Sequence, residues 1–381
     1  IFSLYAFETY LFFVQLNINK HPSKELIYEK TQGKKWDGRT KIEIYEDLNK
    51  KYNNVSLSTE PISFTKNVNI SFLPLSGISN SITINCNENG YYSIYLSDRY
   101  GFNNSDEQWD NKEIEYLLVG DSFTNGSCVN RPNDLASVIR NISKKTSISL
   151  GQSGNGPLME YAVLREYLPL NTNKIVWLYY EGNDLNNLKN EVKNKILINY
   201  LNDLSFNQNL KFRQKEINEL SQSIIESEKE NFIEDEIDRK REILSQTLKY
   251  RLIKLFKIYN TRDLIRLSLD NSENSFKTKE FLKQFKIILT LTKKLADNNG
   301  TKLYFVYLPE YARYKENYKN LEFEKVKNII DELEIKFIDI DKEVFQKKEN
   351  PLELFPFKKR GHYNVEGYQK IGKAIFDLTK D

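Results

Sequence analysis

Apolar and polar positions alternate in blocks of strand and helix from about residue 114 to the end of the chain. Unbroken apolar runs, such as 117–119, predict strands buried on both faces of a sheet. Further strands are predicted at 146–150, 174–180, 302–308 and 336–340, and helices at 133–141, from Pro157 onward, and at 365–378. Strands that alternate with helices build a parallel sheet covered on both faces. The pattern therefore predicts an α/β fold.

The first residues have a different pattern. Residues 1–18 are apolar and aromatic with few polar interruptions, which is marginal for crossing a bilayer, where about 20 apolar residues are needed. We expect the remnant of an N-terminal membrane anchor, in a chain that begins at Ile1 as a fragment or processed form; an amphipathic helix docked on the domain is the alternative. An anchor would place the rest of the chain outside the cytoplasm, in the periplasm or cell envelope.

Residues 19–112 are expected to form an accessory region that is β-rich from about residue 61. A short helix is predicted at 41–51, and 87–90 has the composition of a hairpin turn between two strands. The short strands of this region are predicted at 62–64, 68–72, 81–84 and 91–95.

The remaining residues, 113–381, are expected to form the main domain, interrupted by a polar helical insertion at about 190–300. Ile and Leu recur at helical spacing within Glu and Lys over 216–255. This pattern is typical of a solvated helical hairpin on the edge of the sheet; a lid or partner-binding arm over a site is the alternative.

The charge balance and the two cysteines limit which ligands, metals and cross-links the sequence predicts. Lys and Arg number 56 against 53 Asp and Glu, and the signs are interspersed, so nothing indicates nucleic-acid binding. Cys86 and Cys128 could form a disulfide in an oxidising compartment, or be two unrelated core residues. Their spacing does not fit a zinc cluster, and no metal or cofactor is expected.

Three polar turns follow the first three predicted strands of the main domain, at 120–122, 151–156 and 181–184. The carboxyl ends of parallel strands meet at one edge of the sheet, where ligands bind. Ser122 in the first turn can act as a nucleophile if a base reaches it. The chain has two histidines, and His362, just ahead of the last helix, is the candidate base.

These blocks, in this order, resemble those of SGNH (GDSL-type) hydrolases: Gly120-Asp121-Ser122, the glycine turn 151–156, Glu181-Gly182-Asn183-Asp184 and the His362 segment. The resemblance covers about 114–188 and 302–378. It implies a flavodoxin-like, three-layer α/β/α fold and serine esterase chemistry. It also implies Ser122 as nucleophile, His362 as base, and the Ser122 and Gly154 N–H groups with the Asn183 amide as oxyanion donors.

One position departs from that pattern. Such hydrolases usually carry Asp three residues before the histidine, where this chain has Lys359. Lysine cannot accept the imidazole N–H. The acid is then expected to be Glu353, with Asp339 or Asp341 as alternatives, unless the site is a Ser–His dyad or has lost its activity.

The expected function is hydrolysis or transfer of acyl or acetyl groups on an acylated glycan or a related envelope ester. The layout also resembles membrane-anchored bacterial envelope proteins of the same superfamily. The alternatives are a lipase or lysophospholipase of that superfamily, and a non-catalytic envelope protein that keeps the fold for binding or assembly. The oligomeric state is not predicted.

Overall fold

The computed structural model describes residues 3, 5–10, 22–64, 70–227, 229, 280–316, 318–320 and 322–380. Among these residues, no helix is both long and apolar enough to cross a membrane. Most of the predicted anchor, namely residues 1, 2, 4 and 11–18, lies outside the described part of the chain. So do residues 228 and 230–279 of the predicted helical insertion.

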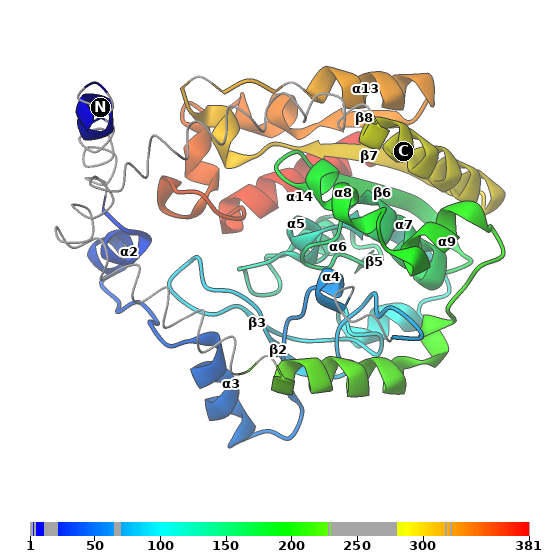
Figure 1. Ribbon diagram of the computed structural model, residues 1–381, viewed down its shortest axis with the longest axis horizontal. Coiled ribbons are helices and arrows are strands. Elements are labelled where there is room, and N and C mark those ends of the chain that lie inside the picture. Colours follow the sequence, from blue (N-terminus) through cyan, green and yellow to red (C-terminus); the bar gives the residue numbers. More distant parts are fainter. Residues whose placement is uncertain are drawn as a thin grey trace.

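The centre of the molecule is a five-stranded sheet of order β5-β4-β6-β7-β8, in which every pair is parallel (Figure 1). Its strands are β4 (Ile114–Gly120), β5 (Ser147–Ser149), β6 (Thr172–Tyr180), β7 (Lys302–Leu308) and β8 (Lys336–Asp339). All five predicted strands are confirmed to within three residues at each end. In β4, β6 and β7 the reason is an uninterrupted apolar run, at 116–119, 175–180 and 303–308, because a strand in the middle of such a sheet is covered on both faces.

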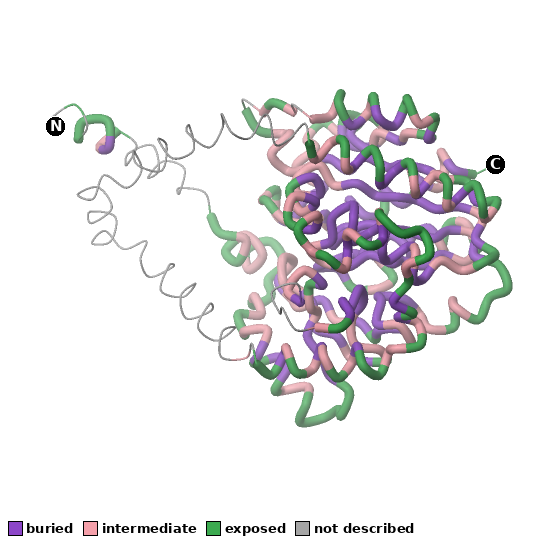
Figure 2. The backbone as a smooth tube through the Cα atoms, turned by 45° about the vertical axis from the view of Figure 1, so that its right-hand side comes forward, coloured by how far each residue is buried: buried purple, intermediate pink, exposed green. Residues whose placement is uncertain are grey.

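Side chains from the two faces of the sheet enter two separate apolar clusters. Leu117 and Val119 of β4 point into one cluster, and Tyr116 and Leu118 into the other, as the alternation of a strand requires. Figure 2 shows the strands as the most continuously buried part of the tube. The predicted three-layer α/β/α arrangement is confirmed.

Helices cover both faces. The first cluster is completed by α7 (Pro157–Tyr167), α8 (Asp184–Glu191), α9 (Lys195–Asn202), α13 (Phe323–Glu332) and the helix at 280–298. The second is completed by α6 (Leu135–Ser143) and α14 (Val365–Thr379). The chain reverses its order across the sheet between β4 and β6, which is the switch point where open α/β sheets bind ligands.

A second, smaller sheet belongs to the N-terminal region. It consists of β1 (Val55–Leu57), β2 (Ile82–Ile84) and β3 (Ile94–Leu96), with β1 parallel and β3 antiparallel to β2. The predicted turn at 87–90 lies in the β2–β3 connection. The helices of this region are α2 (Lys24–Gln32), α3 (Lys41–Asn49) and α4 (Pro61–Phe64), of which α3 matches the predicted helix.

The strand predicted at 62–64 is wrong. These residues form the short helix α4, in which Pro61 occupies the first turn, where its missing N–H has no intrahelical partner to lose. Of the strand predicted at 68–72, residues 68–69 lie outside the described part and 70–72 are not a strand.

The segment predicted as an insertion is partly integral to the fold. Phe285, Ile288 and Leu289 of the helix at 280–298 are fully buried against the central sheet. The helix at 214–227 packs instead on the small sheet, where Ile225 joins its apolar cluster. The described helices of this segment therefore pack on two different sheets, and the predicted hairpin over 216–255 lies largely outside the described residues.

The remaining short helical turns connect these elements. They are η1 (Asp106–Asp110), η2 (Leu210–Phe212), η3 (Tyr311–Tyr314), the π-helical η4 (Asp341–Phe345), η5 (Pro351–Leu354) and η6 (Pro356–Lys358).

Candidate active site

Ser122 lies at the switch point, on the short helix α5 (Ser122–Asn125) that follows β4. The Asp121 carboxylate caps this helix by accepting the N–H of Phe123 at 2.8 Å. Gly120 precedes it at a place with no room for a side chain, since a Cβ there would lie 2.1 Å from Oγ1 of Thr124. The strand therefore turns directly into the helix and leaves the Ser122 hydroxyl at the sheet edge.

The Ser122 hydroxyl meets the imidazole of His362. Its Oγ lies 2.9 Å from Nε2 of His362, although the two residues are 240 positions apart in the sequence. A weaker contact of 3.4 Å joins the same hydroxyl to Oδ2 of Asp121. The predicted nucleophile and the predicted base are thus within hydrogen-bond reach of each other.

Aromatic packing holds the histidine segment. The ring of Phe123 lies 4.7 Å from the imidazole of His362 and stacks on Tyr180 at 3.9 Å. The next residue, Tyr363, is fully buried and donates its hydroxyl to the carbonyl of Pro309 at 2.6 Å. Asn364 then caps α14 by accepting the N–H of Gly367 at 2.9 Å.

A carboxylate does face the other ring nitrogen, and it is Glu88. Its Oε1 lies 3.2 Å from Nδ1 of His362, and its Oε2 accepts the backbone N–H of the same residue at 2.7 Å. Glu88 comes from the turn at 87–90, which the sequence identifies only as a hairpin. The two residues are 274 positions apart, so no local spacing pointed to the pair.

The prediction of Glu353 as the acid is wrong. Its carboxylate is 41% exposed and pairs with Lys358 at 2.9 Å and Lys348 at 3.4 Å. The two alternatives point elsewhere as well. Asp341 accepts the hydroxyl of Tyr314 at 2.6 Å, and Asp339 accepts the N–H of Asp341 at 3.0 Å.

The three predicted oxyanion donors are arranged around the β4, β5 and β6 ends. The N–H of Ser122 lies in the first turn of α5, where N–H groups have no acceptor within the helix. Asn183 precedes α8 but does not cap it with its side chain, which instead hydrogen-bonds to Asp121. Gly154 adopts φ +77°, and a Cβ on it would lie 3.2 Å from Oε2 of Glu60. The accessory region thus contacts the glycine turn through a residue that the sequence did not single out.

Asp121 is fully buried beneath the serine. Burial raises its pKa to about 6, against the opposing effects of the Phe123 N–H, the charge of His362 and the Asn183 side chain. The carboxyl is occupied with capping α5 and with Asn183, so its role in this arrangement is to hold the backbone that presents Ser122.

Cys86 and Cys128 form a disulfide, which joins the strand end before Glu88 to the loop after Ser122. Among the described residues, one group of three side chains has ligand atoms clustered closely enough for a metal ion, namely Cys86, Cys128 and His362. Because both sulfurs are bonded to each other, they offer no thiolate, and we assign no metal to this group.

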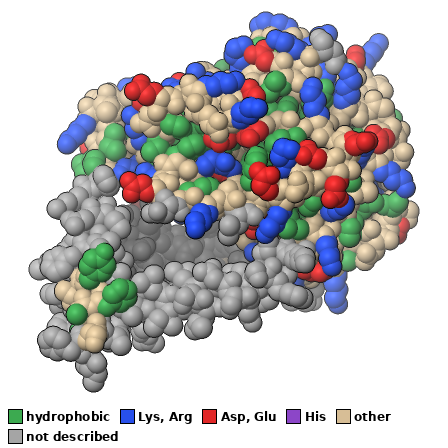
Figure 3. Space-filling view, turned by 90° about the horizontal axis from the view of Figure 1, so that it is seen from above, with side chains coloured by type: hydrophobic (Ala, Val, Ile, Leu, Met, Phe, Trp, Pro, Cys, Tyr) green, Lys and Arg blue, Asp and Glu red, His purple; other side chains and the backbone are tan. Residues whose placement is uncertain are grey.

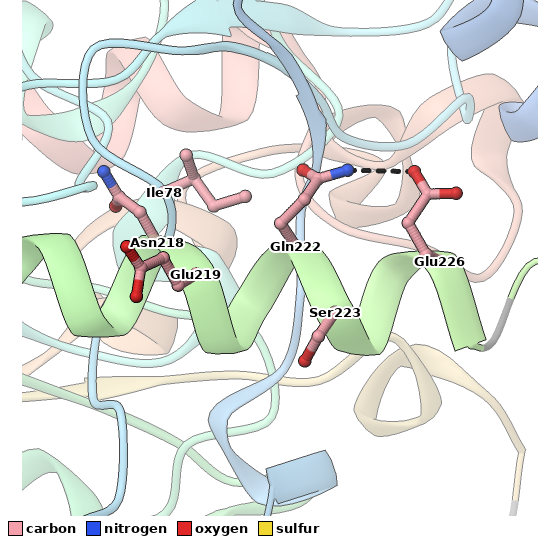
Figure 4. A pocket seen from close by; sticks show the side chains of 6 residues that line it. All are labelled: Ile78, Asn218, Glu219, Gln222, Ser223 and Glu226. Carbon is pink, nitrogen blue, oxygen red and sulfur yellow. Dashed lines mark hydrogen bonds between the residues drawn. The ribbon is translucent and has the colours of Figure 1, made fainter.

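The rest of the described surface is less distinctive. Figure 3 shows Lys and Arg side chains interspersed with Asp and Glu on the face seen from above. A groove runs along the helix at 214–227 (Figure 4) and is lined by Ile78, Asn218, Glu219, Gln222, Ser223 and Glu226. None of the residues around Ser122 lines this groove.

Comparisons with known proteins add little. No protein-family model and no curated protein matches the chain. Among solved structures, the chain is similar to a protein from Desulfitobacterium hafniense described as lipolytic and of the G-D-S-L family. The match has 12% identity and a TM-score of 0.37, and covers 70% of this chain and 99% of the other. At that TM-score the likeness carries no argument about fold or function, and the fold is assigned from the parallel sheet itself.

Proposed function

We propose that the protein is a serine esterase that hydrolyses or transfers acyl groups. The observation that carries the proposal is the 2.9 Å contact between Oγ of Ser122 and Nε2 of His362 at the switch point of the sheet. Two of the four sequence blocks that resemble SGNH hydrolases, those of Ser122 and His362, meet at this contact, which supports the same interpretation.

The proposed reaction has two halves. Oγ of Ser122 attacks the ester carbonyl carbon while Nε2 of His362 takes the hydroxyl proton. The tetrahedral oxyanion is stabilised by the Ser122 and Gly154 N–H groups and the Asn183 amide. The alcohol then leaves with the proton from His362, and the acyl group remains on Ser122. Water, or the hydroxyl of an acceptor, repeats the sequence in reverse and frees the serine.

The substrate we propose is an acylated glycan or a related envelope ester. The Cys86–Cys128 disulfide supports a location outside the cytoplasm, where such bonds persist. Anchoring through residues 1–18 remains part of this proposal. A lipase or lysophospholipase would require an acyl-chain channel, and a binding protein would show no turnover.

The test compares Ser122→Ala with Ser223→Ala, a serine of the helix at 214–227. A fluorophosphonate probe and p-nitrophenyl acetate are applied to wild type and both variants. We expect wild type and Ser223→Ala to be labelled and active, and Ser122→Ala to be unlabelled and at least about 10³-fold slower, since the nucleophile is gone. Labelling or unchanged turnover in a folded Ser122→Ala protein would refute the assignment.

Comparing acetyl with long-chain esters then separates the substrate classes. Faster turnover of acetylated xylan oligomers than of a lysophospholipid supports the glycan proposal, and the reverse order supports a lipase.

A further inference from the structure

Glu88, in the β2–β3 hairpin, contacts His362 with both oxygens of its carboxylate. One oxygen of Glu88 faces Nδ1 at 3.2 Å and the other accepts the backbone N–H at 2.7 Å. The chain makes room for it at Gly361, where a Cβ would lie 2.1 Å from Oε2 of Glu88. The contact between Glu88 and His362 therefore depends both on the hairpin that carries Glu88 and on the glycine that precedes His362.

The surroundings favour an ionised Glu88. Burial opposes ionisation, but the hydrogen bond and charge of His362 and the charge of Lys24 outweigh it, so the pKa of Glu88 lies below its ordinary value. The Lys24 ammonium is 3.6 Å from Oε2. A carboxylate that is ionised can only accept, so the ring proton of a neutral His362 belongs on Nδ1 and Nε2 is left bare toward Ser122.

The hairpin is fastened to the loop that follows the serine. The disulfide joins Cys86, two residues before Glu88, to Cys128. Close to it, the side-chain amide of Asn89 donates to the carbonyl of Cys128 at 2.8 Å. Further along, the N–H of Ile94 donates to Oδ1 of Asn130 at 2.9 Å. The position of Glu88 is thus tied to the same loop as the nucleophile.

We propose that Glu88 is the positioning carboxylate of the site, orienting His362 and stabilising its charged form, and that the Cys86–Cys128 disulfide holds Glu88 there. This inference rests on the proposed esterase function. It places the acid in the accessory region rather than at position 359, where the resembled hydrolases carry Asp, so the main domain alone would lack one member of its catalytic group.

The first test reads the imidazole directly and needs no turnover. The chain has two histidines, so a His21→Gln background leaves one imidazole for ¹⁵N NMR. We expect the Nδ1–H tautomer with a downfield Nδ1 proton, and its loss in Glu88→Gln, which keeps the size of the side chain and removes its charge. The same tautomer and the same proton in a folded Glu88→Gln protein would overturn the proposal.

The second test is kinetic and uses Glu353→Gln as the matched control. Removing the charge behind a catalytic histidine lowers kcat by up to about 10⁴-fold. We expect Glu88→Gln to lose about 10²–10⁴-fold in kcat with KM nearly unchanged, and Glu353→Gln to stay within about twofold of wild type. Gly361→Ala, which must displace the flexible end of Glu88, should be impaired in the same way. Equal kcat for Glu88→Gln and Glu353→Gln would contradict the proposal.

The third test reduces the Cys86–Cys128 disulfide, which joins the hairpin to the loop after Ser122. Dithiothreitol supplies two electrons and two protons, so that the disulfide becomes two thiols and the reagent closes to its own disulfide. We expect kcat to fall at least tenfold, reversibly on reoxidation, while the Cys86→Ser/Cys128→Ser variant is slow from the start and indifferent to the reagent. EDTA is present throughout, because the freed sulfurs and His362 could gather a metal. Full activity of the reduced protein would refute the role of the disulfide.

The outcomes separate this inference from the function on which it rests. If Ser122→Ala keeps its turnover, the esterase proposal fails, whereas the NMR comparison still reports whether Glu88 sets the tautomer of His362. If Ser122→Ala is inactive and Glu88→Gln is not, the esterase stands and the role of Glu88 fails.

Discussion

Glu191 offers a quantitative test of how the glycine turn beside the serine is held. Its carboxylate, at the end of α8, accepts the N–H groups of Gly156 at 2.5 Å, Leu158 at 3.0 Å and Met159 at 3.4 Å. It therefore caps the start of α7 in place of Gly156, which has no side chain to do so. The turn that carries Gly154 ends at this cap.

Burial raises the pKa of Glu191 to about 7, against the effect of these three N–H donors. The unfolded chain releases the same proton near its ordinary pKa, so the folded protein binds it more tightly. The stabilisation is complete below the unfolded pKa and is lost as the pH rises through the folded one. With about 1.4 kcal/mol per pKa unit, about 2–3 kcal/mol of unfolding free energy should disappear between pH 5 and pH 8.5.

Glu191→Gln keeps an acceptor oxygen and cannot titrate. The variant should therefore lack the pH-dependent loss that Glu191 causes in wild type. Between pH 5 and pH 8.5, the decrease in its unfolding free energy should be smaller than that of wild type by about 2–3 kcal/mol. Other buried carboxyls titrate in both proteins. The difference between the two pH profiles therefore reports only on Glu191 and on the carboxyls whose pKa values its charge raises. Burial, and then the charges of neighbouring carboxylates including Glu191, also raise the pKa values of Glu160 and Asp184, which adds to the difference.

The assay is urea unfolding followed by tryptophan fluorescence at several pH values, with the exposed Glu324→Gln variant as control. The control should follow wild type at every pH. Parallel curves for wild type and Glu191→Gln would refute the raised pKa of Glu191.

Two further substitutions test the support of the serine and the histidine. Gly120→Ala should lose at least about 2 kcal/mol of unfolding free energy and its esterase activity together, because the new Cβ would lie 2.1 Å from Oγ1 of Thr124 and 2.7 Å from the carbonyl of Leu178; a folded, active variant by circular dichroism and ester turnover would contradict this. Tyr363→Phe should lose about 1–3 kcal/mol in thermal unfolding, since it removes the hydroxyl that donates to the Pro309 carbonyl, yet should still react with a fluorophosphonate probe. An unchanged melting temperature would show that this hydrogen bond does not stabilise the fold.

The central sheet could be predicted from the sequence because burial on both faces leaves a local trace. Runs such as 175–180 and 303–308 are apolar throughout, as a strand buried on both faces requires. The serine and histidine could be predicted for a related reason, since each sits at a strand end or before a helix that the pattern locates. The short strand expected at 62–64 was wrong because three residues with alternating side chains also fit a single helical turn.

The carboxylate that faces His362 was decided only by the tertiary structure. Local spacing offered Lys359 and Glu353, and neither lies against the imidazole, whereas Glu88 reaches it from a hairpin 274 residues away. A side chain in a turn carries no periodicity that reveals its partner. Sequence patterns therefore predicted the sheet and placed Ser122 and His362 at its edge. Which carboxylate lies against the imidazole was decided by the packing of the accessory hairpin on the loop after Ser122, to which the Cys86–Cys128 bond joins it.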